Sequence, residues 1–260
     1  MEIQQAKSEN SLTQLSPIKT YPSFNFKSSE FLSAICHELK TPLSAIIAFS
    51  DILKDELKTP ASIEECRDYV KEINIAAHDL FDMVHDLLDV QKVETGTFSV
   101  DLNQLIDIRD VLRRAVRLTH DHALKRNISL KTEIAEDVGL VRLDNKRMKQ
   151  ILTNLISNAI KYSSRNSEVK ITISKNNSEK SLKITVADNG PGMNETQVQT
   201  AFVKYKTIAN QNAEAIDSFG FGLPIVKHLV ELQNGKISIE SEVTKGTKVK
   251  LKFNCYGSVS

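Results

Sequence analysis

Residues 31–53 read FLSAICHELKTPLSAIIAFSDIL, and their apolar side chains recur with a period of about 3.5 residues. This period predicts an amphipathic helix that packs in a bundle with other helices. Pro42 occupies a position on the apolar stripe where Ile or Leu would be expected, and a proline inside a helix bends it. His37, beside Glu38, falls farthest from the stripe, so we expect its imidazole to lie in solvent. The stripe comprises Leu32, Ile35, Leu39, Ile46, Phe49 and Leu53.

An exposed histidine on a bundle helix has two interpretations. It is either a solvated surface side chain, which is the more common case, or a ring that the helix presents for chemistry. Residues 31–53 alone favour the surface side chain. The choice depends on what the rest of the chain offers His37 as a reaction partner.

A second helix is predicted downstream of the first. The first pattern runs from about residue 28 to 56 and is broken around Pro60, and the second runs from about 62 to 94. Because only a short break separates them, we expect the two helices to form an antiparallel hairpin. A lone hairpin cannot bury both sides of its apolar seam, so we expect a homodimer in which four helices share one core. The seam of the second helix comprises Val70, Ile73, Ala77, Leu80, Val84 and Leu87.

The pattern changes after residue 94, where short alternating stretches indicate strands and longer periodic stretches indicate helices. Together they predict a mixed α/β domain with a core of its own. Strands are expected at 128–134, 169–175, 181–188, 236–241 and 247–253, and helices at about 109–126, 145–162 and 223–234.

The composition argues against several classes of protein. Thirty-four basic and thirty-three acidic residues are interspersed, which is not typical of a nucleic-acid-binding stripe or a polybasic membrane anchor. The cysteines, Cys36, Cys66 and Cys255, are too far apart for a disulfide framework or a zinc site. No apolar run reaches the length of a membrane span, and no signal peptide is evident. We therefore expect a soluble, cytoplasmic protein, with residues 1–27 as a mobile tail or linker.

Polar residues and glycines after one predicted strand indicate a ligand site. Asp188 ends the strand SLKITVAD and begins the sequence DNGPGM. A carboxylate held there can accept a hydrogen bond from an exocyclic amine such as that of adenine, while the glycines let the backbone approach a ligand closely. Asn-Gly is also a common turn dipeptide, so a plain hairpin turn remains an alternative at this point.

Two further stretches suit a nucleotide. The sequence SFGFGLPIVKHLV, residues 218–230, opens a helix whose first amides can hold phosphate oxygens. The helix at 145–162 carries Asn154, Asn158 and Lys161 on one otherwise apolar face. An asparagine oxygen suits Mg²⁺ that bridges phosphates, and a lysine offsets phosphate charge. The alternative is that these side chains bind only nearby backbone. Tyr162 either stacks on a base or packs in the core.

Six short motifs occur in order along the chain: HELKTP, NLISNAIKY, DNGPGM, FVKY, FGFGLPIVK and KGTKVKLKF. They resemble the motifs of the sensor histidine kinases of two-component systems, over about residues 28–254. The resemblance implies an α+β protein: an antiparallel helical hairpin at 28–94 that forms a dimeric four-helix bundle, and a two-layer α/β sandwich at 100–254 that binds ATP, of the type shared with GHKL ATPases.

The resemblance also implies roles for individual residues. His37 is the phospho-acceptor, Glu38 orients the ring or takes its proton, Asp188 recognises adenine, and Asn158 binds Mg²⁺. Phe202 and Tyr205 match the aromatic motif at the edge of a mobile lid at about 203–217. The remaining residues expected around ATP are Asn154, Lys161, Tyr162, Gly190, Gly192, Gly220, Gly222, Leu223 and Thr247.

The implied activity is ATP-dependent autophosphorylation of His37 followed by phosphoryl transfer to an aspartate of a separate response regulator. Glu38 and Thr41 match the family's E-x-x-T pattern for hydrolysing a phosphorylated receiver, so a phosphatase activity is also implied. No stretch resembles a receiver or a sensor domain. We expect a separate protein to supply the receiver, and either a partner or a longer form of this chain to supply the sensor. Pro42 is the expected hinge for docking the ATP-binding domain.

Two departures from the family pattern concern the lid. Ser218 stands where the second glycine motif commonly has its first glycine, and Pro224 follows Leu223, a position in the first helical turn that tolerates proline.

Two other functions compete with the histidine kinase activity: a scaffold dimer that receives phosphoryl groups without binding ATP, and a GHKL ATPase of the chaperone or mismatch-repair kind. The first has no need of the nucleotide residues, and the second leaves the histidine hairpin unused.

Overall fold

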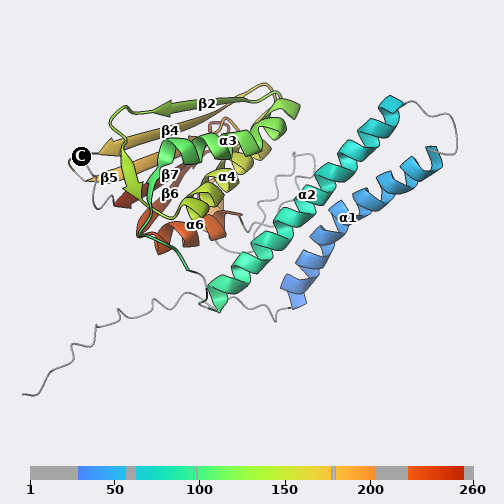
Figure 1. The fold of residues 1–260 in the computed structure, drawn as a ribbon, viewed down its shortest axis with the longest axis horizontal. Helices are drawn as coiled ribbons and strands as arrows, with labels where there is room; N and C mark the ends of the chain where they lie inside the picture. The colour runs from blue at the N-terminus through green and yellow to red at the C-terminus, as the bar shows by residue number, and fades with distance from the viewer. Residues whose placement is uncertain are drawn as a thin grey trace, which may run out of the picture.

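The computed structural model describes residues 29–56, 63–95, 97, 99–176, 178, 180–202 and 222–254. Several sequence predictions lie outside these residues: the tail at 1–27, the break around Pro60, the lid at about 203–217 with Tyr205, and the positions of Ser218 and Gly220. Figure 1 shows a helical hairpin beside a unit in which helices pack on a sheet.

The hairpin consists of α1 (Ser29–Glu56) and α2 (Ile63–Glu94), which lie side by side (Figure 1). Both helices agree closely with their predicted ranges. Pro42 lies inside α1, is buried, and does not end the helix. The ring of Phe49 stacks on that of Tyr69, with the ring centroids 6.2 Å apart. The predicted stripe of α1 therefore packs toward α2.

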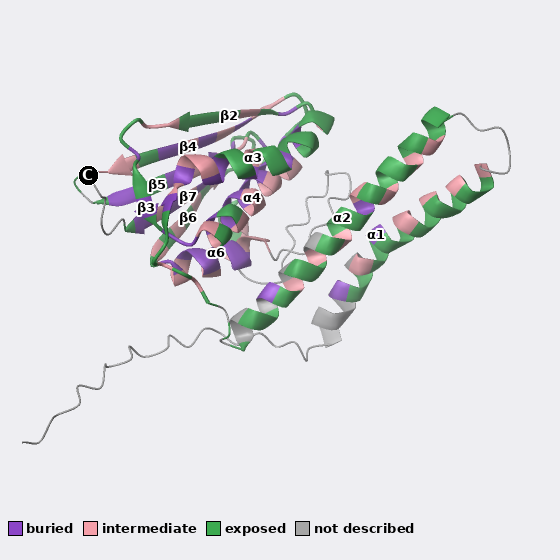
Figure 2. Cartoon of the chain, in the orientation of Figure 1, coloured by how far each residue is buried: buried purple, intermediate pink, exposed green. Residues whose placement is uncertain are grey.

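Much of the hairpin is exposed in the single chain (Figure 2), and the exposed residues include large apolar ones. Phe81 is 59% exposed, and within the predicted seam of α2 the alternate positions Val70, Ala77 and Val84 are exposed while the others are half-buried. Two helices alone cannot cover both sides of such a seam. The exposed large apolar side chains of the hairpin are Leu43, Ile47, Ile52, Ile63, Val70, Phe81, Val84 and Leu88.

The second unit is built on a five-stranded sheet in the order β2-β4-β5-β7-β6. The pair β2–β4 is parallel because β3 and α4 intervene between these strands in the sequence, and the other pairs are antiparallel. All five strands were predicted from their alternation. Their bounds are β2 Ser129–Ile134, β4 Glu168–Asn176, β5 Ser181–Ala187, β6 Gly235–Glu242 and β7 Gly246–Asn254.

Three helices, α3 (Ile108–Lys125), α4 (Asn145–Tyr162) and α6 (Gly222–Leu232), cover one face of the sheet (Figure 1). The alternation of each strand places its apolar side chains toward these helices and its lysines and threonines toward solvent. The predicted α+β class, with a helical hairpin followed by a two-layer α/β sandwich, is confirmed. The buried inner face of the sheet comprises Val169, Ile171, Ile173, Leu182, Ile184, Val186, Val249, Leu251 and Phe253.

Three short elements were not predicted. Strands β1 (Leu105–Asp107) and β3 (Leu140–Arg142) form a separate antiparallel pair, and α5 (Glu195–Thr200) is a six-residue helix. Three residues are too few to show a period. The sequence did contain the start signal of α5, because the side chains of Asn194 and Gln197 each accept a hydrogen bond from the other's backbone N–H.

In the parts of the chain that the structure describes, no helix combines the length and the apolar character that crossing a membrane requires.

Candidate functional site

His37 lies on α1 and is exposed, as predicted from its distance to the apolar stripe. Ile35 and Pro42, which belong to that stripe, are buried on the packed side of the helix. Thr41 follows His37 by one helical turn and is also exposed. Glu38 lies within the same helix, and its side chain is not among those that the structure describes. The imidazole is therefore accessible to another domain or protein.

Asp188 follows the last residue of β5 and is held by two backbone amides. Its Oδ1 accepts hydrogen bonds from the N–H of Gly190 (2.8 Å) and from the N–H of Thr247 (3.2 Å). Burial raises the pKa of the Asp188 carboxyl, and these two hydrogen bonds oppose part of that rise. Because both amides bind Oδ1, Oδ2 is the oxygen suited to accept a hydrogen bond from a ligand.

The glycines around Asp188 leave no room for side chains. A Cβ on Gly190 would lie 2.5 Å from the carbonyl oxygen of Tyr162 and 2.9 Å from Asp188 Oδ1. Gly192 has φ of +67°, and a Cβ there would collide with the carbonyl of Glu242. The structure thus brings together three predicted site residues, Asp188, Gly190 and Tyr162, although they come from different elements.

Gly246 was not assigned a role from the sequence, although it is the final glycine of the last motif. It has φ of +84°, and a Cβ there would collide with the carbonyl oxygen of Asp188. Its absence of a side chain lets the turn before β7 close against the Asp188 segment. The next residue, Thr247, then donates its N–H to the carboxylate and accepts a hydrogen bond from the N–H of Asp188 (2.9 Å).

Helix α4 carries the polar side chains that were predicted to lie on one of its faces. Asn154, Asn158, Lys161 and Tyr162 are half-buried on it, while its other face packs in the core. The Nδ2 atom of Asn154 is buried without a hydrogen-bond partner. An unsatisfied buried amide of this kind costs on the order of 1–3 kcal/mol, which a ligand oxygen would offset.

The start of α6 meets α4 at Asn158. A Cβ on Gly222 would lie 3.2 Å from Asn158 Nδ2, so a larger residue would crowd the amide. Leu223 is the next residue of α6 and packs against the core. Two predicted site residues from segments distant in sequence are therefore adjacent.

Two polar side chains near these residues were not predicted. The Ser241 hydroxyl accepts a hydrogen bond from the N–H of Met193 (2.8 Å) and lies 2.9 Å from the hydroxyl of Thr247, which ties the Gly192 segment to β6 and β7. The ammonium of Lys227 on α6 lies 5.6 Å from the ring centroid of Phe202. Ser241 fits the polar side of an alternating strand, so nothing in the sequence distinguished it.

Among the described residues, no group of three or more histidine, cysteine, aspartate or glutamate side chains is arranged to hold a metal ion. This is compatible with Mg²⁺, which usually keeps several waters and binds through one or two protein oxygens together with substrate phosphates. Asn158 offers one amide oxygen, and the unsatisfied amide of Asn154 suits an oxygen of the nucleotide itself.

Comparison with known families accounts for both parts of the structure. Residues 27–96 match the His Kinase A (phospho-acceptor) domain, and residues 143–256 match the Histidine kinase-, DNA gyrase B-, and HSP90-like ATPase family. This chain belongs to the histidine kinases. The resemblance inferred from the six motifs is thereby confirmed. The first match also accounts for the hairpin, which a chaperone or mismatch-repair ATPase would leave unexplained.

Curated relatives support the same family. The cell-division control histidine kinases PdhS of Brucella suis and Brucella abortus are 29% identical over 234 residues, which is 86% of this chain and 22% of theirs. This histidine kinase chain therefore spans about a fifth of the length of the curated relatives it matches.

Solved structures show that the fold is shared. Full-length ShkA in complex with AMPPNP matches with a TM-score of 0.62 at 23% identity, over 89% of this chain and 47% of that one. The histidine kinase ThkA in complex with the response regulator protein TrrA matches with a TM-score of 0.60 at 21% identity, over 88% and 62%. AdeS of Acinetobacter baumannii matches with a TM-score of 0.60 at 19% identity, over 85% and 98%.

Proposed function

We propose that this chain uses ATP to phosphorylate itself on His37 and then passes the phosphoryl group to an aspartate of a separate response regulator. The observation that carries the proposal is the exposed His37 on a hairpin of the phospho-acceptor family, followed in the same chain by an ATPase-type domain with Asp188 in place. We assign residues 28–94 to dimerisation and phosphotransfer and residues 100–254 to ATP binding.

The nucleotide is held by both layers of the second domain. Asp188 Oδ2 accepts a hydrogen bond from the adenine amine. We place Gly190 and Gly192 beside the base, where the absence of side chains lets their segment lie close to Tyr162 and Glu242. Asn154 contributes its unsatisfied amide and Lys161 its charge. The other residues that we place around ATP are Tyr162, Phe202, Gly220, Gly222, Leu223 and Thr247.

Mg²⁺ would be held by the side-chain oxygen of Asn158 and by the phosphates of ATP. When bound, it neutralises part of the phosphate charge. The half-buried position of Asn158 beside Gly222 supports this assignment.

Autophosphorylation is a displacement at the γ-phosphorus of ATP. A neutral nitrogen of His37 donates its lone pair to phosphorus, the bond to the β,γ-bridging oxygen breaks, and ADP leaves with that electron pair. The carboxylate of Glu38 takes the proton that the imidazole loses. Most of the rate acceleration then comes from holding ATP in line with His37, which requires the second domain to dock on the hairpin.

The phosphoryl acceptor in the second step is an aspartate on a receiver domain. ThkA, which shares this fold, is known in complex with the response regulator protein TrrA, and this supports a partner of the same kind here. Glu38 and Thr41 would also serve hydrolysis of the phosphorylated receiver, with Thr41 positioning the attacking water. Decay of the phospho-receiver that Thr41→Ala leaves unchanged would contradict this second activity.

The hairpin dimerises through the apolar side chains that a single chain leaves exposed. A second copy would cover them in a four-helix bundle, which the match to the phospho-acceptor family supports. The free thiols of Cys36 and Cys66 suit a reducing compartment, and we place the protein in the cytoplasm.

One experiment separates the candidate functions. The protein is incubated with γ-labelled ATP and Mg²⁺, and the label is tested for lability in acid, which is expected of phosphohistidine. His37→Gln should lose the label and retain ATP binding. Label that survives in His37→Gln would contradict the proposed nucleophile, and absence of ATP binding would favour a scaffold that only receives phosphoryl groups.

A further inference from the structure

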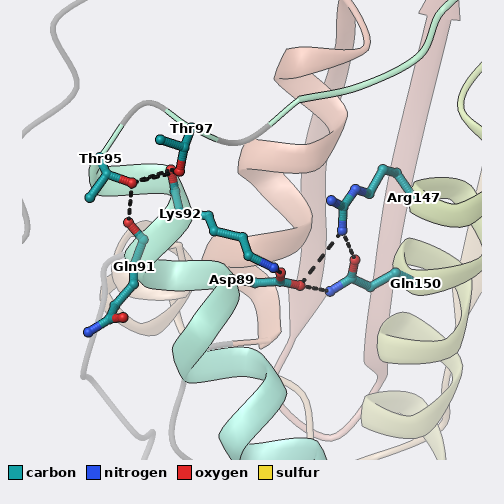
Figure 3. Close-up of polar contacts among 7 residues, drawn as sticks. All are labelled: Asp89, Gln91, Lys92, Thr95, Thr97, Arg147 and Gln150. Atoms are coloured by element: carbon teal, nitrogen blue, oxygen red, sulfur yellow. Dashed lines mark hydrogen bonds and ion pairs between the residues drawn. The ribbon is translucent and has the colours of Figure 1, made fainter.

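A buried carboxylate joins the two domains. Asp89, near the end of α2, is only 6% exposed. Its Oδ2 accepts a hydrogen bond of 2.6 Å from Nε2 of Gln150 and lies 3.9 Å from Nη1 of Arg147 (Figure 3). Its Oδ1 lies 3.7 Å from the ammonium of Lys92. Arg147 also donates a hydrogen bond of 3.2 Å to Oε1 of Gln150.

The contacts of Asp89 with Gln150 and Arg147 exist only while the domains are together. Asp89 and Lys92 belong to the hairpin, whereas Arg147 and Gln150 belong to α4 of the ATP-binding domain. An aspartate on a hairpin helix is normally solvated, and taking its charge out of water is unfavourable unless partners compensate. Arg147 and Gln150 supply that compensation across the interface. Substituting Asp89 takes the acceptor away from Gln150, and substituting Gln150 takes this donor away from Asp89.

Helix α4 also carries the residues that we place around the nucleotide. Its first turn is fixed by Asp144, whose Oδ1 accepts from the N–H of Arg147 (3.0 Å) and whose Oδ2 accepts from the N–H of Asp101 (2.9 Å). Asn158 lies about 12 Å farther along the same helix than Gln150. Because a helix of this length moves as a rod, holding its first turns on α2 fixes the position of the nucleotide site relative to the hairpin.

The end of α2 is itself well fixed beside Asp89. The hydroxyl of Thr95 donates to the carbonyl of Gln91 (3.1 Å), and the N–H of Thr97 donates to the carbonyl of Lys92 (3.0 Å). The hydroxyls of Thr95 and Thr97 lie 2.7 Å apart (Figure 3). The carboxylate therefore projects from a capped helix end, where little slack separates it from α4.

In this docked arrangement His37 remains exposed. We propose that Asp89, Arg147 and Gln150 form an interdomain latch that holds the ATP-binding domain on α2 and away from His37, and so restrains autophosphorylation until it opens. The latch rests on the proposed function, because it regulates the autophosphorylation assigned above. In the latch, the carboxylate of Asp89 on α2 faces the side-chain N–H groups of Arg147 and Gln150 on α4.

The test exchanges the acceptor and the donor. Gln150→Glu places a second carboxylate against Asp89, and Asp89→Asn removes the charge that Arg147 and Lys92 compensate. The double variant Asp89→Asn/Gln150→Glu restores one amide and one carboxylate with their positions exchanged. Asp68→Asn is the matched control, because Asp68 is an exposed aspartate near the other end of α2.

Docking is measured without nucleotide. Spin labels are placed at cysteines that replace the exposed residues Glu72 on α2 and Arg117 on α3, with Cys36, Cys66 and Cys255 changed to serine. The labelled chain is mixed with an excess of unlabelled chain, so that pulsed electron paramagnetic resonance reports the distance between the domains of one chain. One narrow distance is expected in the parent and the Asp68→Asn control, a broader distribution in each single variant, and a narrow one again in the double variant. Narrow distributions in both single variants would overturn the latch.

Restraint is measured as the initial rate of autophosphorylation at saturating ATP. Loss of a charge-assisted hydrogen bond shifts such an equilibrium by about tenfold, so each single variant should label up to about tenfold faster, with the double variant near the parent rate. The KM for ATP should stay within about twofold, because the latch residues are outside the nucleotide site. Slower labelling in the single variants would overturn the restraining role. Failure of the parent to label His37 would contradict the proposed function, whereas the distance measurements would still test the latch.

Discussion

At the scale of single residues, Asp188 shows how burial and hydrogen bonding compete on one carboxyl. Burial raises its pKa, so the ionised form that accepts a hydrogen bond is less favoured than in a solvated aspartate. A folded-state pKa above the unfolded value means that its stabilising contribution is present at low pH and is lost as pH rises through the folded pKa. The ionised carboxylate therefore costs stability in the state that binds ATP.

We predict that ATP affinity falls on acidification at a pH above the usual titration range of an aspartate, because protonation removes the acceptor for the adenine amine. Asp188→Asn should bind ATP weakly and lose this pH dependence. Without nucleotide, it should melt at pH 7 no lower than the parent, since it removes a buried charge. Titration calorimetry and thermal melts between pH 5 and 8 measure both effects. A parent whose affinity has the same pH dependence as that of Asp188→Asn would contradict the role of the carboxylate.

Gly246 tests the close approach of two segments at the same place. Gly246 has φ of +84°, and a Cβ there would collide with the carbonyl oxygen of Asp188. We therefore predict that Gly246→Ala lowers the free energy of unfolding by about 2 kcal/mol or more and weakens ATP binding. Gly139 is the matched control, because nothing lies within 4 Å of a Cβ built there. Gly139→Ala should change the free energy of unfolding by no more than about 0.5 kcal/mol. Equal effects in denaturant melts would refute the prediction.

At the scale of secondary-structure elements, long elements could be predicted from the sequence, whereas short elements and contacts between residues distant in sequence could not. Helix α4 and strand β5 were predicted because their periods persist over many residues, whereas β1 and β3 are too short to show one. Asp188 and the glycines of its motif were predicted by residue type next to a strand end. The contact of Gly246 with Asp188 and that of Asp89 with Gln150 were not, because each joins segments distant in sequence.

The exposed seam of α2 leads to a prediction for the hairpin. Val84 is on the predicted seam and remains exposed in one chain, so Val84→Lys would bury an ammonium in each half of the proposed dimer. We expect the dimer to weaken by more than about 2 kcal/mol, which sedimentation equilibrium measures as a shift toward monomer. His78→Lys, at an exposed position off the seam, should leave the dimer intact. An unchanged dimer in Val84→Lys would place the interface elsewhere.

At the scale of the whole molecule, the two domains must occupy two arrangements if both proposals hold. In one, the latch at Asp89 holds the ATP-binding domain on α2 and His37 is open, which suits access by a receiver domain. In the other, the γ-phosphate meets His37. The energy that separates them has to be small, since a few hydrogen bonds and a bend in α1 decide the balance.

Pro42 is where such a bend would originate, because it lies inside α1 and cannot donate a backbone hydrogen bond to the carbonyl of Glu38. Pro42→Ala should restore that bond, stiffen α1 and raise the melting temperature. It should also lower the rate of autophosphorylation several-fold without changing ATP affinity, because docking rather than binding is impaired. Ser44→Ala, at an exposed position on the same helix, controls for substitution near His37. A labelling rate that stays at the parent value in a more stable Pro42→Ala helix would mean that the domains move about a different hinge.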